Sequence, residues 1–173
     1  MAIILPRQFS AILFPSLMLV LAGCCANNVC DCADERADAV ELRFSSAYRA
    51  ADLDTIIIKR FPRRFTAATK PDSVTLIRTA VRARDSILLN NNAPFAQTGT
   101  AKINQYRYVI RYLVQAPKKK PVVTTAFVID SIRLRGSLEG NGCCSCYTNT
   151  EKVVFAKDSA VDLKRKPYLV IAK

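Results

Sequence analysis

The chain of 173 residues contains no histidine. Histidine is the usual general base and the commonest metal ligand, so its absence excludes Ser-His and Cys-His catalysis and imidazole-based metal sites. A glycine-rich phosphate loop is also missing, because the segment GSLEGNG at 136–142 lacks the Lys and the Ser or Thr that complete such a loop. We predict that this segment is a turn. Since neither a histidine-based site nor a phosphate loop is present in the sequence, we expect no catalytic residue.

Acidic residues are the scarcer charge: 14 Asp and Glu stand against 26 Lys and Arg, which gives a net charge of +12. Such an excess suggests an anionic neighbour, either an anionic glycan or lipid headgroups. We expect no nucleic-acid partner, since no recognition helix or base-stacking signature is present. The candidate anion-binding residues form the densest basic group of the sequence; they are Arg107, Arg111, Lys118, Lys119 and Lys120. The alternative is that this group is a solvated strand edge.

No apolar run is long enough to span a membrane as a helix. The uncharged, mainly apolar stretch at 8–23 has about 16 residues, whereas a spanning helix needs roughly 20. A single basic residue, Arg7, precedes this stretch. A basic start followed by a short apolar run is typical of an export signal, so we predict a signal peptide over residues 1–23.

The end of this stretch reads Leu21-Ala22-Gly23-Cys24 and resembles the lipobox of bacterial lipoprotein precursors. In that family the chain is cut before the cysteine, which receives a diacylglycerol on its sulfur and an acyl group on its new amino terminus. The resemblance covers residues 1–24 and indicates no family for the rest. It implies lipidation of Cys24, no other cofactor, and an extracytoplasmic place on a bacterial membrane, with the outer membrane favoured. The alternatives are an ordinary cleaved secretory signal and an uncleaved anchor.

Six further cysteines form two clusters, Cys25, Cys30 and Cys32 in the first and Cys143, Cys144 and Cys146 in the second. In an oxidising compartment they predict up to three disulfides. Neighbouring cysteines make strained rings, because a relaxed bridge needs Cα atoms about 5.5 Å apart. We therefore expect bridges between the clusters, and all six cross-cluster pairings stay open. The alternatives are free or partly paired thiols and a thiolate metal site. Cys-x-Cys spacing supports a metal site only weakly, so we expect no metal.

Three regions follow from these patterns. Residues 1–23 are the signal peptide, 24–39 are the lipidated cysteine and a small, polar tether, and 40–173 are a single β-rich domain. Fully extended, the tether would reach roughly 50 Å. Bridges from its cysteines to the second cluster would remove most of that reach and hold the domain close to the membrane.

The domain is predicted to be all-β, an antiparallel β-sandwich, Ig-like or similar, of about eight strands. Alternating or β-branched segments carry this prediction. They are VELRFS, DTIIIKRF, QYRYVIRYLV, VVTTAFVIDSIRLRG, EKVVFAKDS and PYLVIAK. Residues 72–92 fit either a helix or two strands; we favour strands, because the neighbouring segments are strands and Asn90 to Asn92 signal a turn.

We therefore expect a membrane-anchored, non-catalytic binding or scaffold domain, whose protein partner the sequence does not indicate. The first alternative is a thiolate metal-binding or redox protein that uses the two cysteine clusters. A carboxylate-based hydrolase that uses Asp52 and Asp54 is less favoured, because two aspartates beside a strand more often keep the strand entrance soluble.

Overall fold

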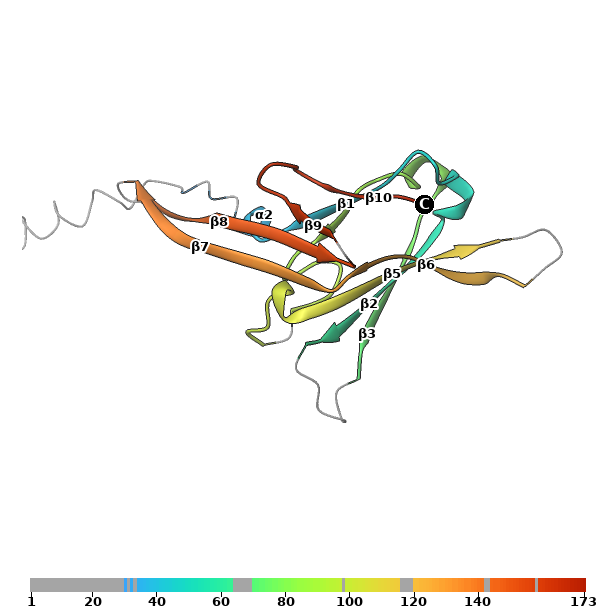
Figure 1. Cartoon of the computed structure of the whole chain (residues 1–173), viewed down its shortest axis with the longest axis horizontal. Helices are drawn as coiled ribbons and strands as arrows, with labels where there is room; N and C mark the ends of the chain where they lie inside the picture. The colour runs from blue at the N-terminus through green and yellow to red at the C-terminus, as the bar shows by residue number, and fades with distance from the viewer. Residues whose placement is uncertain are drawn as a thin grey trace, which may run out of the picture.

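The computed structural model of the chain describes residues 30, 32, 34–63, 70–97, 99–115, 120–141, 144–157 and 159–173. These residues form ten strands in three sheets, which confirms the all-β prediction (Figure 1). The two strands beyond the expected eight arise because one predicted segment, VVTTAFVIDSIRLRG, divides into two strands, and because the four-residue strand β9 has no predicted counterpart. Within the described part of the chain, no helix has the length and apolarity needed to cross a membrane.

The first sheet has the order β10-β1-β4. Its central strand β1 runs parallel to β10 and antiparallel to β4. Alternate residues of β1 are buried, as the pattern VELRF predicts, while Arg43 on the other face is exposed. The strands comprise Val40–Phe44 (β1), Ile87–Leu89 (β4) and Leu169–Ile171 (β10).

The second sheet has the order β3-β2-β5-β6, and all its pairs are antiparallel. Its inner face carries the tyrosines of β5, of which Tyr106, Tyr108 and Tyr112 are each at most 7% exposed. These rings are therefore packing residues of the core. The strands comprise Thr55–Pro62 (β2), Asp72–Ile77 (β3), Tyr106–Val114 (β5) and Val122–Ile129 (β6).

The third sheet has the order β7-β8-β9 and corrects two sequence predictions. GSLEGNG does not form a turn at 136–141, because these residues pair with β8 to its start at Cys144. The predicted strand VVTTAFVIDSIRLRG divides at Asp130, whose carboxylate accepts hydrogen bonds from the backbone of Lys157 and from Arg107. The strands comprise Ser131–Asn141 (β7), Cys144–Ala156 (β8) and Ser159–Asp162 (β9).

Short helices connect these strands. The strand prediction for residues 72–92 is confirmed, since β3 and β4 lie there with one turn of 3-10 helix between them. The predicted asparagine turn also forms: the Asn90 side chain accepts hydrogen bonds from the backbone of Asn92 and Ala93. The helices comprise Asp34–Ala37 (α2), Ala50–Asp52 (η1), Ala80–Arg82 (η2) and Ile103–Gln105 (η3).

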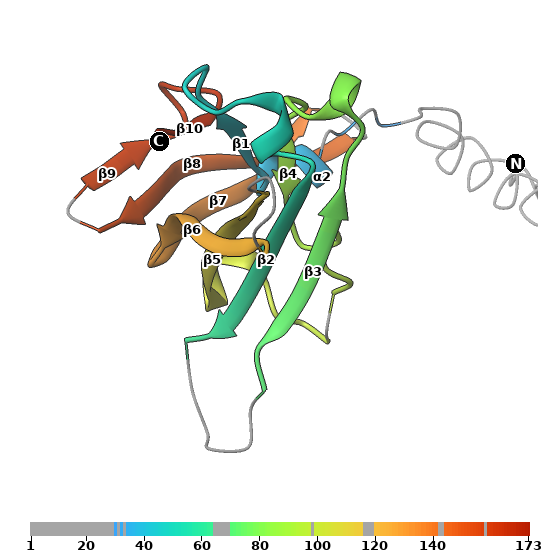
Figure 2. The same cartoon turned by 90° about the vertical axis from the view of Figure 1, so that its right-hand side faces the viewer.

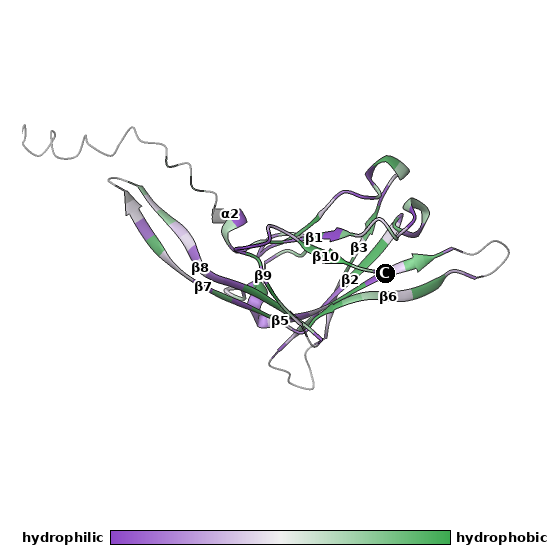
Figure 3. Ribbon diagram, turned by 45° about the horizontal axis from the view of Figure 1, so that its top comes forward, coloured by the Kyte–Doolittle hydropathy of each residue, from purple (hydrophilic) through white to green (hydrophobic). Residues whose placement is uncertain are grey.

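One hydrophobic core joins the three sheets, with Leu42, Ile58, Ile110 and Val154 fully buried in it. Three hairpins extend from this core. The β7-β8 and β5-β6 hairpins point to opposite ends of the long axis of the molecule (Figure 1), and the β2-β3 hairpin projects away from β1 and β10 (Figure 2). Hydrophobic residues continue along β6 to the outer end of its hairpin (Figure 3).

Candidate functional site

Two disulfides join the cysteine clusters, as the sequence predicts. Cys30 bonds to Cys144 and Cys32 bonds to Cys146, with Cα separations of 5.4 and 5.3 Å. Both pairs are separated by 114 residues, so residues 30 to 32 run in the same direction as the start of β8. We call these two bridges the staple. The other predicted disulfide residues, Cys25 and Cys143, lie outside the described residues, as does Cys24.

The chain after the staple stays on the edge of β8. Asn149 donates from Nδ2 to the carbonyl of Ala37 and, at 3.0 Å, to Oδ1 of Asp38. Nζ of Lys152 donates to the carbonyls of Ala39 and Arg36, at 3.0 and 3.3 Å, and burial lowers the pKa of this lysine. Residues 34 to 39, expected as part of an extended tether, are thus folded against β8.

The staple bears on the metal and redox alternative. A metal site of the predicted kind needs thiolates, whereas four of the cysteines form disulfides. Among the residues that the structure describes, no group of His, Cys, Asp and Glu side chains is arranged to hold a metal ion. The two disulfides argue against the thiolate metal-binding interpretation of the clusters, because that interpretation needs these sulfurs to be free thiolates.

The predicted anion-binding residues do not form one cluster. Arg107 and Arg111 share the outer face of β5, about 13 Å apart at the usual rise of a strand. Arg107 is paired with Asp130 at 3.1 Å. Arg111 is half-buried nearer to the end of the strand, and Lys120 is exposed just before β6. Lys118 and Lys119 lie outside the described residues.

A second basic region, which sequence reasoning missed, lies at the end of the molecule opposite to the β7-β8 tip (Figure 1). We call it the distal end. It consists of the β1-β2 and β3-β4 connections, the outer end of the β5-β6 hairpin and the residues after β10. Its described part carries three carboxylates, on Asp52, Asp54 and Asp85, against six cations, on Arg49, Arg78, Arg82, Arg84, Lys120 and Lys173. These cations come from four separate segments, so no local run of the sequence signals the surface.

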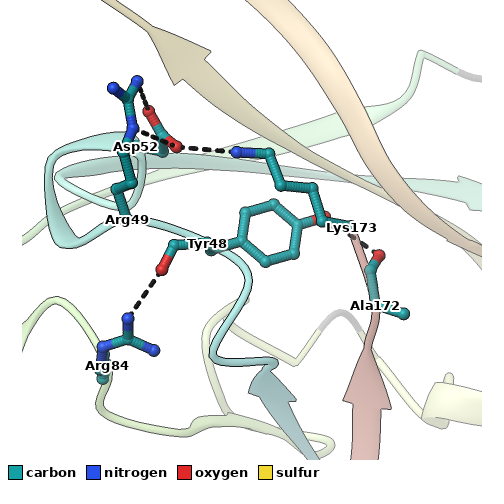
Figure 4. A network of polar contacts seen from close by, with 6 residues as sticks. All are labelled: Tyr48, Arg49, Asp52, Arg84, Ala172 and Lys173. Atoms are coloured by element: carbon teal, nitrogen blue, oxygen red, sulfur yellow. Dashed lines mark hydrogen bonds and ion pairs between the residues drawn. The ribbon is translucent and has the colours of Figure 1, made fainter.

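Asp52 organises one side of the distal end (Figure 4). This side chain is only 3% exposed and forms ion pairs with Arg49 at 2.8 Å and Lys173 at 3.1 Å. The hydrogen bond from Arg49, helped by Lys173, lowers the pKa of Asp52 to about 2. Tyr48 completes the network, because its hydroxyl donates to the carbonyl of Ala172 and its own carbonyl accepts from Arg84.

The two aspartates of the hydrolase alternative have different partners. Asp52 is held by the two cations, whereas Asp54 accepts a hydrogen bond from Gln115 at 3.2 Å. A groove of about 670 Å³ lies elsewhere, at the end of β2 and beside η3, and the described residues that line it include no carboxylate, serine or lysine. Among the described residues, Asp52 and Asp54 thus have separate partners, and neither lines this groove.

Exposed aliphatic side chains accompany the cations at the distal end. The structure leaves seven large hydrophobic side chains exposed among the described residues, and four of them lie there. Ile77 pairs with Thr55 at one edge of the sheet, and Val123 pairs with Leu113 at the other. The four side chains, with their exposed fractions, are Ile77 (85%), Val81 (92%), Val122 (60%) and Val123 (46%). Exposed aliphatics beside arginines are typical of an interaction surface.

Comparison of the chain with models of known protein families, with characterised proteins and with solved structures finds no match.

Proposed function

We propose that the protein is a non-catalytic lipoprotein, anchored through Cys24 to a bacterial membrane, in which the distal end binds an anionic glycan outside the cytoplasm. One observation carries the proposal: the staple begins six residues after Cys24, and the basic distal end lies at the other end of the long axis (Figure 1). A lipid on Cys24 would therefore attach the domain by one end and leave the cationic end directed away from the bilayer.

The composition of the distal end supports a polyanionic ligand. The surface has twice as many cations as carboxylates, and Asp52 is already neutralised by Arg49 and Lys173. Arg82 and Lys120 are exposed and come from two different connections. Separated cations around a few aliphatic side chains suit a chain of uronate sugars, which offers a carboxylate on each residue and apolar ring faces between them.

The test uses the lipidated protein, purified from membranes and reconstituted in phosphatidylcholine vesicles. Its intact mass, with and without reduction, reports cleavage before Cys24, acylation and the number of bridges. Vesicles that carry the protein are expected to co-sediment fluorescent polygalacturonate. The double variant Arg82→Glu with Lys120→Glu should retain about tenfold less polymer, because it reverses two surface contacts of about 0.5 to 1 kcal/mol each.

The matched control is Lys166→Glu, which reverses an exposed charge in the β9-β10 connection. It should bind as the unaltered protein does. Cys24→Ala should abolish acylation and association with vesicles. Equal loss of polymer in the control and the double variant would contradict a specific role of the distal end. A protein of full-length mass without acyl chains would contradict the anchor.

A further inference from the structure

We infer that the tip of the β7-β8 hairpin rests on the phospholipid surface and inserts Leu138 into its interfacial layer. The tip comprises residues 136–141 of β7 and 144–147 of β8. This inference rests on the proposed lipid anchor at Cys24 and adds to it a second point of contact, which fixes how the domain stands on the membrane.

Chain length brings the lipid to this tip. Cys30 follows Cys24 by six positions, so the acylated residue lies at most roughly 20 Å from Cys30. The Cα of Cys30 is 5.4 Å from that of Cys144, and Cys144 pairs with Asn141 at the outer end of the hairpin. Without the staple the same anchor would act through residues 24–39, which reach roughly 50 Å.

One face of the tip suits an interfacial layer. Leu138 is 68% exposed and pairs with Tyr147, and the neighbouring pair on the same face is Gly140 with Ser145. This face therefore carries a leucine, a tyrosine and two small uncharged residues. Glu139 pairs with Cys146 and, by the alternation of a strand, points to the opposite face.

The position of Tyr147 leaves Leu138 as the outermost apolar side chain on this face, among the residues that the structure describes. A Cβ atom added to Gly136 would lie 2.7 Å from Cζ of Tyr147, so the tyrosine ring lies over this glycine and back toward the core. Nζ of Lys102 is 5.4 Å from the centre of the same ring. A tyrosine flanked by a lysine, with a leucine beyond them, is typical of segments that lie in the membrane interface.

The chain contains no tryptophan, so a single introduced tryptophan reports its own surroundings. The lipidated Leu138→Trp variant is reconstituted in phosphatidylcholine vesicles with and without brominated acyl chains. Its emission should shift to the blue and fall by about half with brominated lipid, because interfacial side chains enter roughly 5–10 Å. The matched control is Val81→Trp, a more exposed site at the distal end, which should show neither change.

Flotation of the vesicles distinguishes failure of the lipid anchor at Cys24 from failure of the contact between the hairpin tip and the membrane. If both variants float with the vesicles and Leu138→Trp is not quenched, the anchor stands and the contact of the tip is wrong. If neither variant floats, the anchor fails, and the inference fails with it. Reduction of the two disulfides is a further test. Opening the staple should lower the quenching of Leu138→Trp while the protein still floats with the vesicles. Unchanged quenching after complete reduction would contradict the role of the staple in seating the tip.

Discussion

At the scale of single residues, two buried charges tie distant segments together. Arg60 is 6% exposed, stacks between the rings of Phe95 and Tyr106, and donates to Asp72 and to the carbonyl of Ala96. Asp52 is 2% exposed and joins η1 to Lys173, two residues after β10. A buried charge without its partners costs several kcal/mol, so both side chains depend on segments far away in the sequence.

Asp52 makes stability depend on pH in the acidic range. Its pKa falls from 3.8 to about 2 on folding, because Arg49 and Lys173 stabilise the charged form. A depressed pKa stabilises the folded state above pH 4, and this contribution, about 2 kcal/mol, is lost as the pH falls toward 2. Asp52→Asn should therefore lower the free energy of unfolding at pH 7 and flatten its fall between pH 4 and 2, as measured by urea unfolding.

The control for this variant is Glu139→Gln, which removes a carboxylate from an exposed position. It should leave the free energy of unfolding at pH 7 within about 0.5 kcal/mol of the original value. An unchanged slope of stability between pH 4 and 2 in Asp52→Asn would contradict the assigned role.

Alternation along the strands predicted most of the core residues but not these charges. In β5 the tyrosines fall on one face and the arginines on the other, and burial follows that pattern. In β2 the same alternation puts Arg60 on the inner face with Ile56 and Ile58. Its partners lie 12 to 46 residues away in sequence, so no local pattern identifies a buried arginine there.

At the scale of elements, glycine accounts for the wrong prediction at 136–141. Glycine-rich segments usually mark turns, yet Gly136 lies inside β7, where the register shifts and a neighbouring ring comes close. An added Cβ would lie 2.5 Å from the carbonyl oxygen of Thr148. The sequence shows that residue 136 has no side chain. Only the pairing of β7 with β8 shows that the ring of Tyr147 occupies the space beside it.

This close contact makes Gly136→Ala destabilising. The new methyl group must displace the backbone of β8 or the ring of Tyr147, which should cost about 1–3 kcal/mol. For a domain of this size that loss lowers the melting temperature by several degrees, roughly 2–4 °C per kcal/mol. The tyrosine signal in near-ultraviolet circular dichroism is the suitable measurement.

Gly140→Ala is the matched control, since it makes the same change four residues away in the same strand. The nearest atom to its added Cβ lies 3.8 Å away, an ordinary contact. It should melt within about 2 °C of the original protein, given a cost of a few tenths of a kcal/mol. Equal melting temperatures of the two variants would show that the space over Gly136 is not filled.

At the scale of the whole molecule, the staple closes two loops of almost identical extent. A first bridge across 114 residues removes chain entropy from the unfolded state worth about 4–5 kcal/mol. A second bridge, two residues further along, removes little of the conformational freedom that the unfolded chain keeps after the first bridge has formed. The two bridges should therefore be strongly non-additive.

Replacing one bridge at a time tests this. Cys30→Ser with Cys144→Ser, or Cys32→Ser with Cys146→Ser, should lower the free energy of unfolding by about 1 kcal/mol or less, whereas all four replacements should cost about 4–5 kcal/mol. Urea unfolding of the lipidated protein in detergent gives these values. If each pair alone cost as much as all four changes together, the bridges would act through local geometry rather than through loop closure.

The sequence predicted the all-β class and the bridging of the two clusters, but not the arrangement of the sheets. The strand β9 has only four residues, too few for alternation to be recognised, whereas β4 and β10 lie in segments that the sequence predicts as strands. The parallel pairing of β1 with β10 joins Leu42 to Leu169, and the distal end gathers cations from positions between 49 and 173. Contacts of this kind depend on the complete fold, which a linear pattern does not contain.

The pairing of β1 with β10 also bears on the order of folding. The earliest strand of the chain has β4 on one side, and its other side is filled by residues that are synthesised 127 positions after Leu42. The first sheet thus cannot be completed before residues 169–171 have left the ribosome. The part of the core that Leu42 and Leu169 share can thus form only after every strand of the other two sheets has been synthesised.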